Sequence, residues 1–183
     1  MNWRNTPSRY GSVSIGLHWL MLLLIAAVYA CIELRGNFPK GSDLREGLKT
    51  WHFMLGISVL VLVVLRAVLN FSDRTPPIRP EPPGWQARLG VLMHYALYLL
   101  MIAMPLLGWL TLSAEGKQIP FFGLHLPPLV AESKSVAGWC KDIHEAGGTI
   151  GYFLIGLHAA AALYHHYVLR DNTLERMVPA PGR

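Results

Sequence analysis

Four stretches of the chain are long and apolar enough to cross a lipid bilayer, and they limit the fold more than any other feature. They cover residues 15–32, 53–69, 89–112 and 146–169. A bilayer core about 30 Å thick is crossed by roughly 20 helical residues. Because lipid offers the backbone no water, each stretch is expected to be a helix. We predict an all-α membrane protein, a four-transmembrane-helix bundle in a single domain (1–183), with helices at about 13–33, 49–70, 88–112 and 143–169.

Composition agrees with a membrane protein. Of the 183 residues 52% are hydrophobic and only 15% are charged, against about 25% charged residues in soluble domains. The two cysteines, Cys31 and Cys140, exclude a disulfide scaffold, although a single bond between them is left open. Residues 28–31 faintly resemble a lipoprotein cleavage site, but His18 and Trp19 do not suit the apolar region of a signal peptide, so we keep the first helix.

The distribution of basic residues predicts the orientation. Nine of the 16 Lys and Arg residues lie on the side of the N-terminal segment, the second connection and the C-terminal segment, counting Arg66 near the end of the second helix, and seven lie in the first and third connections. Cytoplasmic segments carry the excess of Lys and Arg, so we expect both termini on the cytoplasmic side. Membrane topology thus accounts for the net charge of +5, and no nucleic-acid partner is required.

The histidines of the fourth helix are the first functional signal. A titratable side chain within a membrane is costly and marks a functional site by default, although a hydrogen bond to a neighbouring helix is the alternative. His144 and His158 are 14 residues apart. The rotation between them is about 40° short of four turns and the rise is about 21 Å, so both face nearly the same way at opposite sides of the bilayer.

Each of these histidines has a partner at its own depth. With alternating helix directions, His18 pairs with His158 on the inner side, and His52 pairs with His144 on the outer side. Two imidazoles from different helices are the axial ligands that a six-coordinate b-type haem needs. Zinc would require its ligands to converge within about 2 Å of one ion, which His144 and His158 cannot do. The spacing therefore predicts two b haems.

With these residues in view, the chain resembles the bacterial cytochrome b561 family over nearly its full length. The matching features are residues 15–19 (Ile-Gly-Leu-His-Trp), His52 at the start of the second helix, residues 151–166 and residues 171–174. The resemblance implies that His18, His52, His144 and His158 hold the two haems. It also implies an inner-membrane oxidoreductase that oxidises superoxide at the periplasmic side and passes the electrons to ubiquinone.

Several residues suit that reaction. Lys49 and Lys141 each precede an outer ligand by three residues, where they would attract superoxide; interfacial lysines or partners of haem propionates are the alternatives. Further basic residues of the same connections, which hold seven acids as well, are Arg35, Lys40, Arg45 and Lys134.

The inner side offers residues for the quinone. His165 lies seven residues beyond His158, on the same helical face, where an imidazole would supply a proton to a quinone. Arg66 would bind a haem propionate or the quinone, unless it only extends toward the membrane surface. His94 is expected to be a packing or second-shell residue and His166 an interfacial one, and His125 has no assigned role.

Two other functions fit the same pattern. One is a di-haem electron-transfer subunit that links a partner dehydrogenase or hydrogenase to the quinone pool, with the long connection 113–143 as its docking surface. That connection is expected to be functional or to contain a short helix. The other is a haem-free helical bundle whose histidines only pack. The sequence leaves the oligomeric state open, a homodimer included.

Overall fold

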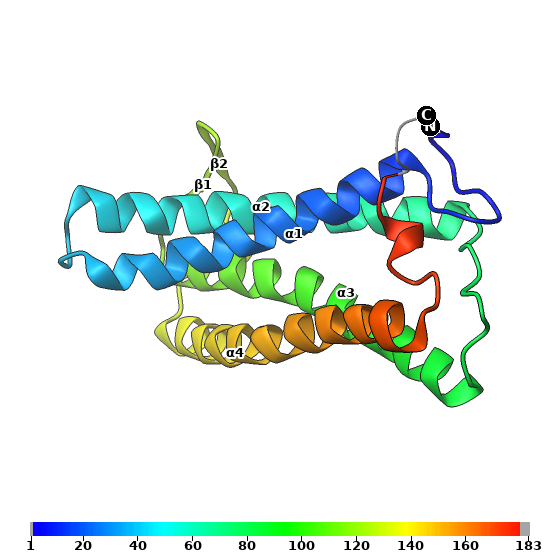
Figure 1. The fold of residues 1–183 in the computed structure, drawn as a ribbon. Helices are drawn as coiled ribbons and strands as arrows, with labels where there is room; N and C mark the ends of the chain where they lie inside the picture. Colours follow the sequence, from blue (N-terminus) through cyan, green and yellow to red (C-terminus); the bar gives the residue numbers. More distant parts are fainter. Residues whose placement is uncertain (1, 180–183) are drawn as a thin grey trace. The chain divides into compact units, whose positions relative to one another are not determined.

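The computed structural model describes residues 2–179. Four long helices contain most of them: α1 (Ser12–Leu34), α2 (Asp43–Ser72), α3 (Gly84–Ala114) and α4 (Lys134–Tyr164), shown in Figure 1. All four are long and apolar enough to cross a membrane. The prediction of a mostly helical chain with four such helices is therefore confirmed.

All four helices begin before the residues predicted from hydropathy, and two of them, α2 and α4, begin at least six residues earlier. They start at Asp43 and Lys134, well before the predicted residues 49 and 143. The preceding residues, Ser42 and Ser133, are N-caps, because each hydroxyl accepts the backbone N–H of the third residue after it at 3.4 Å. Capping residues of this kind satisfy the amides that the first turn leaves free. The added turns are polar, so hydropathy alone does not detect them.

The long connection between α3 and α4 contains a β-hairpin in place of the short helix considered above. Strand β1 (Ile119–Phe121) pairs antiparallel with β2 (Leu124–Leu126). The connection is also tied to α3, because the indole N–H of Trp109 donates to the Pro127 carbonyl at 3.0 Å.

Apolar side chains cover the outside of the helices. Leu23, Phe71 and Phe153 are 68%, 82% and 74% exposed. In a soluble protein such a surface would be an aggregation hazard, whereas lipid is a suitable solvent for it.

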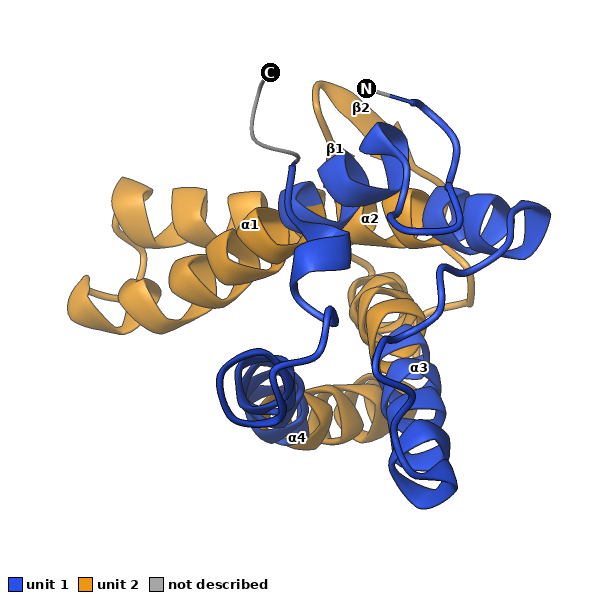
Figure 2. Ribbon diagram, turned by 45° about the vertical axis from the view of Figure 1, so that its right-hand side comes forward, with its two compact units in different colours: residues 1–20, 64–99, 150–183 blue, residues 21–63, 100–149 orange. Residues whose placement is uncertain are grey.

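The described residues form two compact units, which are coloured separately in Figure 2. Unit 1 comprises residues 1–20, 64–99 and 150–183, and unit 2 comprises residues 21–63 and 100–149. Each unit contains a section of every long helix. The two units are described separately below.

The chain ends and the α2–α3 connection lie together in unit 1. The backbone N–H of Tyr10 donates to the Arg176 carbonyl at 3.3 Å, and that of Asn5 donates to an Asp73 carboxylate oxygen at 2.8 Å. After α4 the chain continues through a π-helical turn (His165–Leu169) and a short 3-10 helix (Glu175–Met177). The connection between α2 and α3, residues 73–83, forms no helix or strand.

Candidate functional site

His52 of α2 and His144 of α4 lie side by side in unit 2. Their ring centres are 6.1 Å apart, and the ring planes are inclined by 72°. Two imidazoles that bind one metal ion from opposite sides, with nitrogen–metal distances of about 2 Å, have ring centres roughly 6 Å apart. The spacing thus fits two axial ligands of one ion.

The backbone of α1 fixes the chemistry of the His52 ring. Nδ1 of His52 is 3.0 Å from the carbonyl oxygen of Val28. Because a carbonyl only accepts, Nδ1 carries the hydrogen and Nε2 keeps its lone pair. Metal-bound histidines are held in this way by a carbonyl or carboxylate at the other ring nitrogen.

A small, partly open apolar pocket lies against the two rings. Two glycines in its lining, Gly56 and Gly108, lack the side chains that would narrow it. A Cβ atom on Gly108 would be only 3.4 Å from Cε1 of His144, whereas one on Gly56 would meet no atom within 4 Å. The cavity therefore leaves room for a flat group between α2, α3 and α4.

Met104 of α3 supports His144. Nδ1 of His144 is buried, and within residues 2–179 no group meets the geometry of a hydrogen bond with it, although the Met104 backbone lies beside the ring. The Met104 thioether lies against α4, where a Cβ atom on Gly147 would come within 2.5 Å of its sulfur. Helix α3 thus approaches α4 closely at this point.

A second histidine pair lies in unit 1. The ring centres of His18 on α1 and His158 on α4 are 6.3 Å apart, with the planes inclined by 61°. This separation also fits two ligands of one ion. Among the described residues, no group of three or more His, Cys, Asp or Glu side chains is placed to hold a metal ion. A metal ion held by one of these pairs would therefore have only two protein ligands. Haem iron suits such a pair, because the porphyrin supplies its other ligands.

His94 of α3 joins this second pair. Its ring centre is 5.4 Å from that of His158, and its Nδ1 is 2.7 Å from the Gly90 carbonyl oxygen. The expectation of a packing or second-shell residue agrees with this position. The sequence could not assign this contact. Apolar residues are spread around the whole of α3, so hydropathy does not fix the rotation of the helix about its axis.

Arg66 lies near the rings of unit 1. It acts electrostatically on His18 and His158. It also lines a small, partly open pocket together with Tyr10, Ser14 and Asn70. Hydroxyl, amide and guanidinium donors around one cavity suit a carboxylate, and a haem carries two carboxylates as propionates.

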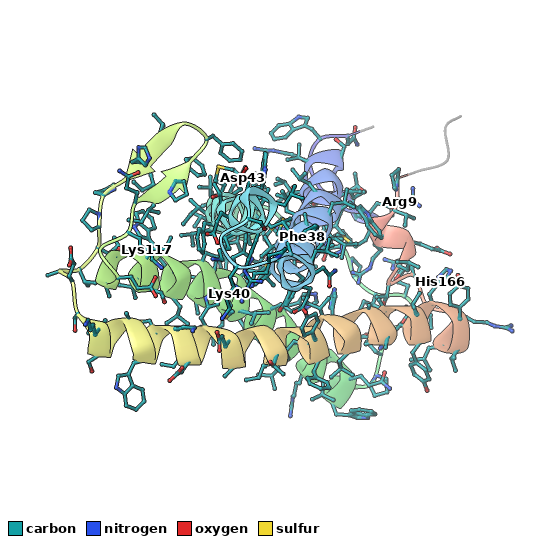
Figure 3. All side chains as sticks on the ribbon, turned by 90° about the vertical axis from the view of Figure 1, so that its left-hand side faces the viewer. Arg9, Phe38, Lys40, Asp43, Lys117 and His166 are labelled. Atoms are coloured by element: carbon teal, nitrogen blue, oxygen red, sulfur yellow. The ribbon has the colours of Figure 1, made fainter. Side chains whose placement is uncertain are left out.

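His165 lies at the end of α4, beside the C-terminal segment. Its Nδ1 is 2.5 Å from a carboxylate oxygen of Asp171, and their side chains are 19% and 3% exposed. The adjacent His166, labelled in Figure 3, contacts Tyr167 through ring centres 4.7 Å apart. Asp171 was not singled out from the sequence, although it opens the segment 171–174 that carries the family resemblance.

Both lysines expected to attract superoxide are in ion pairs. Lys49 is 2.7 Å from Glu46, and Lys141 is 3.8 Å from Glu145. Their helical spacings of three and four residues would have predicted these pairs. Another basic side chain, that of Arg35, acts electrostatically on His52. Arg45 donates to the Arg35 and Phe38 carbonyl oxygens, each at 3.0 Å, and so holds the α1–α2 connection in place.

The two cysteines, Cys31 and Cys140, are free thiols in unit 2. His125 lies on the exposed strand β2, apart from the histidine pairs of the described structure.

Comparison with known proteins identifies the family. A family model described as prokaryotic cytochrome b561 matches residues 9–180. The chain belongs to this family. Cytochrome b561 homolog 1 of Escherichia coli is 43% identical over 172 residues, covering 94% of this chain and 98% of the relative. Probable superoxide oxidase CybB of Yersinia pestis is 41% identical over 171 residues, covering 93% and 96%. Cytochrome b562 of Cereibacter sphaeroides is 28% identical over 176 residues, covering 92% and 94%.

Membership of the cytochrome b561 family confirms the resemblance drawn from the sequence. The chain is a multi-pass bacterial membrane protein of the electron-transfer type, and its family implies b-type haem. The residues present fit that group: two histidine pairs have the spacing of bis-imidazole ligands, and glycines line a cavity beside one of them.

Proposed function

We propose that this cytochrome b561 is a superoxide:ubiquinone oxidoreductase of the bacterial inner membrane. It would oxidise superoxide to O₂ at the periplasmic side and pass the electrons through two haems to ubiquinone. The observation that carries this proposal is the presence of two separate histidine pairs, one in each unit, with ring centres 6.1 and 6.3 Å apart. A relative with 41% identity, named as a probable superoxide oxidase, supports the choice of substrate.

Two haems would be held by the chain's own histidines. His52 and His144 would bind the outer haem, and His18 and His158 the inner haem. When bound, the haems accept and release single electrons. The Val28 carbonyl orients the His52 ring. Arg66 would bind a propionate of the inner haem, because its cavity is lined with hydrogen-bond donors.

The overall reaction balances without a further oxidant. Two superoxide ions each lose one electron and leave as O₂, and one ubiquinone takes up two electrons and two protons to become ubiquinol. Oxidation of superoxide needs no general base, so the outer site has only to attract the anion. The inner site must supply protons, and His165 is proposed as their donor.

Attraction of superoxide would be local. Lys49 and Lys141 would still attract the anion, but less strongly, because the ion pairs with Glu46 and Glu145 offset their positive charge. Arg35 adds a positive charge that acts at His52. Since exposed charges are screened within about 8 Å at physiological ionic strength, steering by these side chains should weaken in salt.

Spectroscopy of the purified protein tests the proposal. Superoxide from an enzymatic source should reduce the haems within the mixing time, and a short-chain ubiquinone should then reoxidise them. Haem reduction only after addition of a partner dehydrogenase or hydrogenase would favour the electron-transfer subunit. A colourless protein from cells supplied with haem would contradict both functions and leave the haem-free bundle.

A further inference from the structure

The chain folds back onto the end of α4 and brings an acid beside His165. The π-helical turn ends at Arg170, whose φ of 54° is in the left-handed region. The backbone N–H of Asp171 then donates to the His165 carbonyl at 3.1 Å. This reversal, rather than helical spacing, places the Asp171 side chain against the His165 ring.

Asp171 is a buried carboxylate with several partners. One oxygen is 2.5 Å from Nδ1 of His165, and the other accepts the Thr173 N–H at 2.8 Å. Burial alone would raise the pKa of Asp171, but hydrogen bonds from His165 and Thr173 outweigh it and hold that pKa below its ordinary value. The carboxylate is therefore negatively charged at neutral pH.

A buried arginine completes the cluster. Arg176 is only 7% exposed. Its guanidinium donates to the Pro76 carbonyl, lies 5.7 Å from the centre of the Tyr10 ring and acts electrostatically on Asp171. Next to His165 lie Asp171 and Tyr164, the last residue of α4, whose ring centre is 6.3 Å from that of His165; Arg176 acts on the Asp171 side of this cluster.

We propose that Asp171 is the positioning residue of His165 in the protonation of quinone. This inference rests on the proposed function and adds to it. The carboxylate accepts the Nδ1 hydrogen, holds the ring in one orientation and leaves Nε2 as the atom that donates.

The proton transfer balances. After electrons reach the quinone, the Nε2–H bond of protonated His165 breaks and an O–H bond forms on a quinone oxygen. The neutral imidazole keeps its Nδ1 hydrogen toward Asp171 and then takes a proton from water. The second proton follows by repetition of the cycle, and Asp171 remains ionised throughout.

The test is the pH dependence of haem reoxidation by short-chain ubiquinone in the Asp171→Asn variant. An amide keeps the size of the side chain and an acceptor for Thr173 but removes the charge. Without the carboxylate, Nδ1 of His165 loses the partner that holds the ring in one orientation, so the pH profile of the rate should change. At pH 8, where protons are scarce, the rate should be on the order of tenfold lower, and near pH 6 it should approach the wild-type rate.

Asp73→Asn is the matched control, because Asp73 is also an aspartate of unit 1 that accepts a backbone N–H, from Asn5. Its pH profile should equal that of the wild type. Haem spectra and the rate of haem reduction by superoxide should be unchanged in both variants. A uniform loss of rate in Asp171→Asn, with the wild-type pH profile, would show a structural role only and overturn the inference.

A second variant tests the inference if Asp171→Asn fails to fold. If Asp171→Asn does not retain haem, His165→Gln should show slow reoxidation without the wild-type pH dependence; a retained dependence would refute the proposal. Failure of ubiquinone to reoxidise superoxide-reduced haem in the wild-type protein would instead reject the proposed function, and the inference with it. If the wild-type protein reacts normally and the pH profile of Asp171→Asn is the same as that of the wild type, only the inference is rejected and the proposed function is not.

Discussion

At the scale of single residues, the positions of the paired histidine rings depend on neighbouring residues that make no polar contact with them. Gly108 is the clearest example, because a Cβ atom there would be 3.4 Å from the His144 ring. A Cβ atom at this distance would already be in van der Waals contact with the ring, so the two further methyl groups of a valine would press against it. His144 has little freedom to move, since its Nδ1 is buried and Met104 lies against the same helix.

The Gly108→Val variant should therefore lose the haem of unit 2. We expect the haem content to fall from two to about one per chain, since ligand geometry must be nearly ideal for axial binding. A pyridine haemochrome assay of the purified protein measures it. Gly138→Ala is the control, because a Cβ atom on Gly138 meets no atom within 4 Å; equal haem contents in the two variants would contradict the proposed site.

Replacement of the ligands gives a direct test of their pairing. His52→Ala and His144→Ala should each remove one and the same haem, and His18→Ala and His158→Ala should remove the other. The reason is that a bis-imidazole haem is held by both of its ligands. Low-temperature difference spectra distinguish the two haems, with His125→Ala as the control, and loss of different haems from His52→Ala and His144→Ala would contradict the assignment.

At the scale of elements, the C-terminal segment fastens several parts of unit 1. Asn172 alone has three contacts with the α2–α3 connection: its side-chain oxygen accepts the Arg79 N–H at 2.7 Å, its backbone N–H donates to the Arg79 carbonyl at 3.0 Å and its amide nitrogen is 3.5 Å from the Pro77 carbonyl oxygen. The indole N–H of Trp19 in α1 donates to the Met177 carbonyl at 2.8 Å.

Loss of the Asn172 side chain should release this segment. Asn172→Ala removes an acceptor and a donor, at a cost of about 1 kcal/mol, so the open form should become about fivefold more populated. Trypsin cleavage after Arg176, which is buried, should accelerate by the same factor. Asn172→Asp keeps the acceptor for Arg79 and should be cleaved nearly as slowly as the wild type; equal cleavage of all three proteins would contradict the fastening role.

The sequence predicts these elements to different degrees. Hydropathy locates the lipid-crossing part of each helix, because lipid imposes that pattern, but it cannot reveal the polar turns that Ser42 and Ser133 begin. Depth matching pairs His18 with His158 and His52 with His144, because helix rise is fixed, and the rings of each pair are neighbours in the structure. The contact of Asp171 with His165 follows from a left-handed residue at Arg170, and no spacing rule anticipates that reversal.

At the scale of the whole molecule, the bias of basic residues predicts the orientation. Nine of the 16 Lys and Arg residues belong to the side that holds both termini, and such segments remain cytoplasmic. Alkaline phosphatase fused after residue 183 should therefore be inactive, and green fluorescent protein at the same place should fluoresce. Phosphatase fused after residue 130, in the third connection, should be active. Active phosphatase at the C-terminus would reverse the assigned sides.

The hairpin tip has a consequence for experiments on the ligand helix. Phe122 has a φ of 45° and is followed by Gly123 at 85°, a pattern of type I′ turns, where asparagine is preferred to a bulky side chain. The centre of the Phe122 ring is 6.2 Å from that of the Trp51 ring. The Phe122 N–H donates to the Met54 sulfur at 3.3 Å. Trp51 and Met54 flank His52, so hydrogen exchange at the Phe122 amide should report a loosening of α2 around His52, such as the release of the proposed haem would cause.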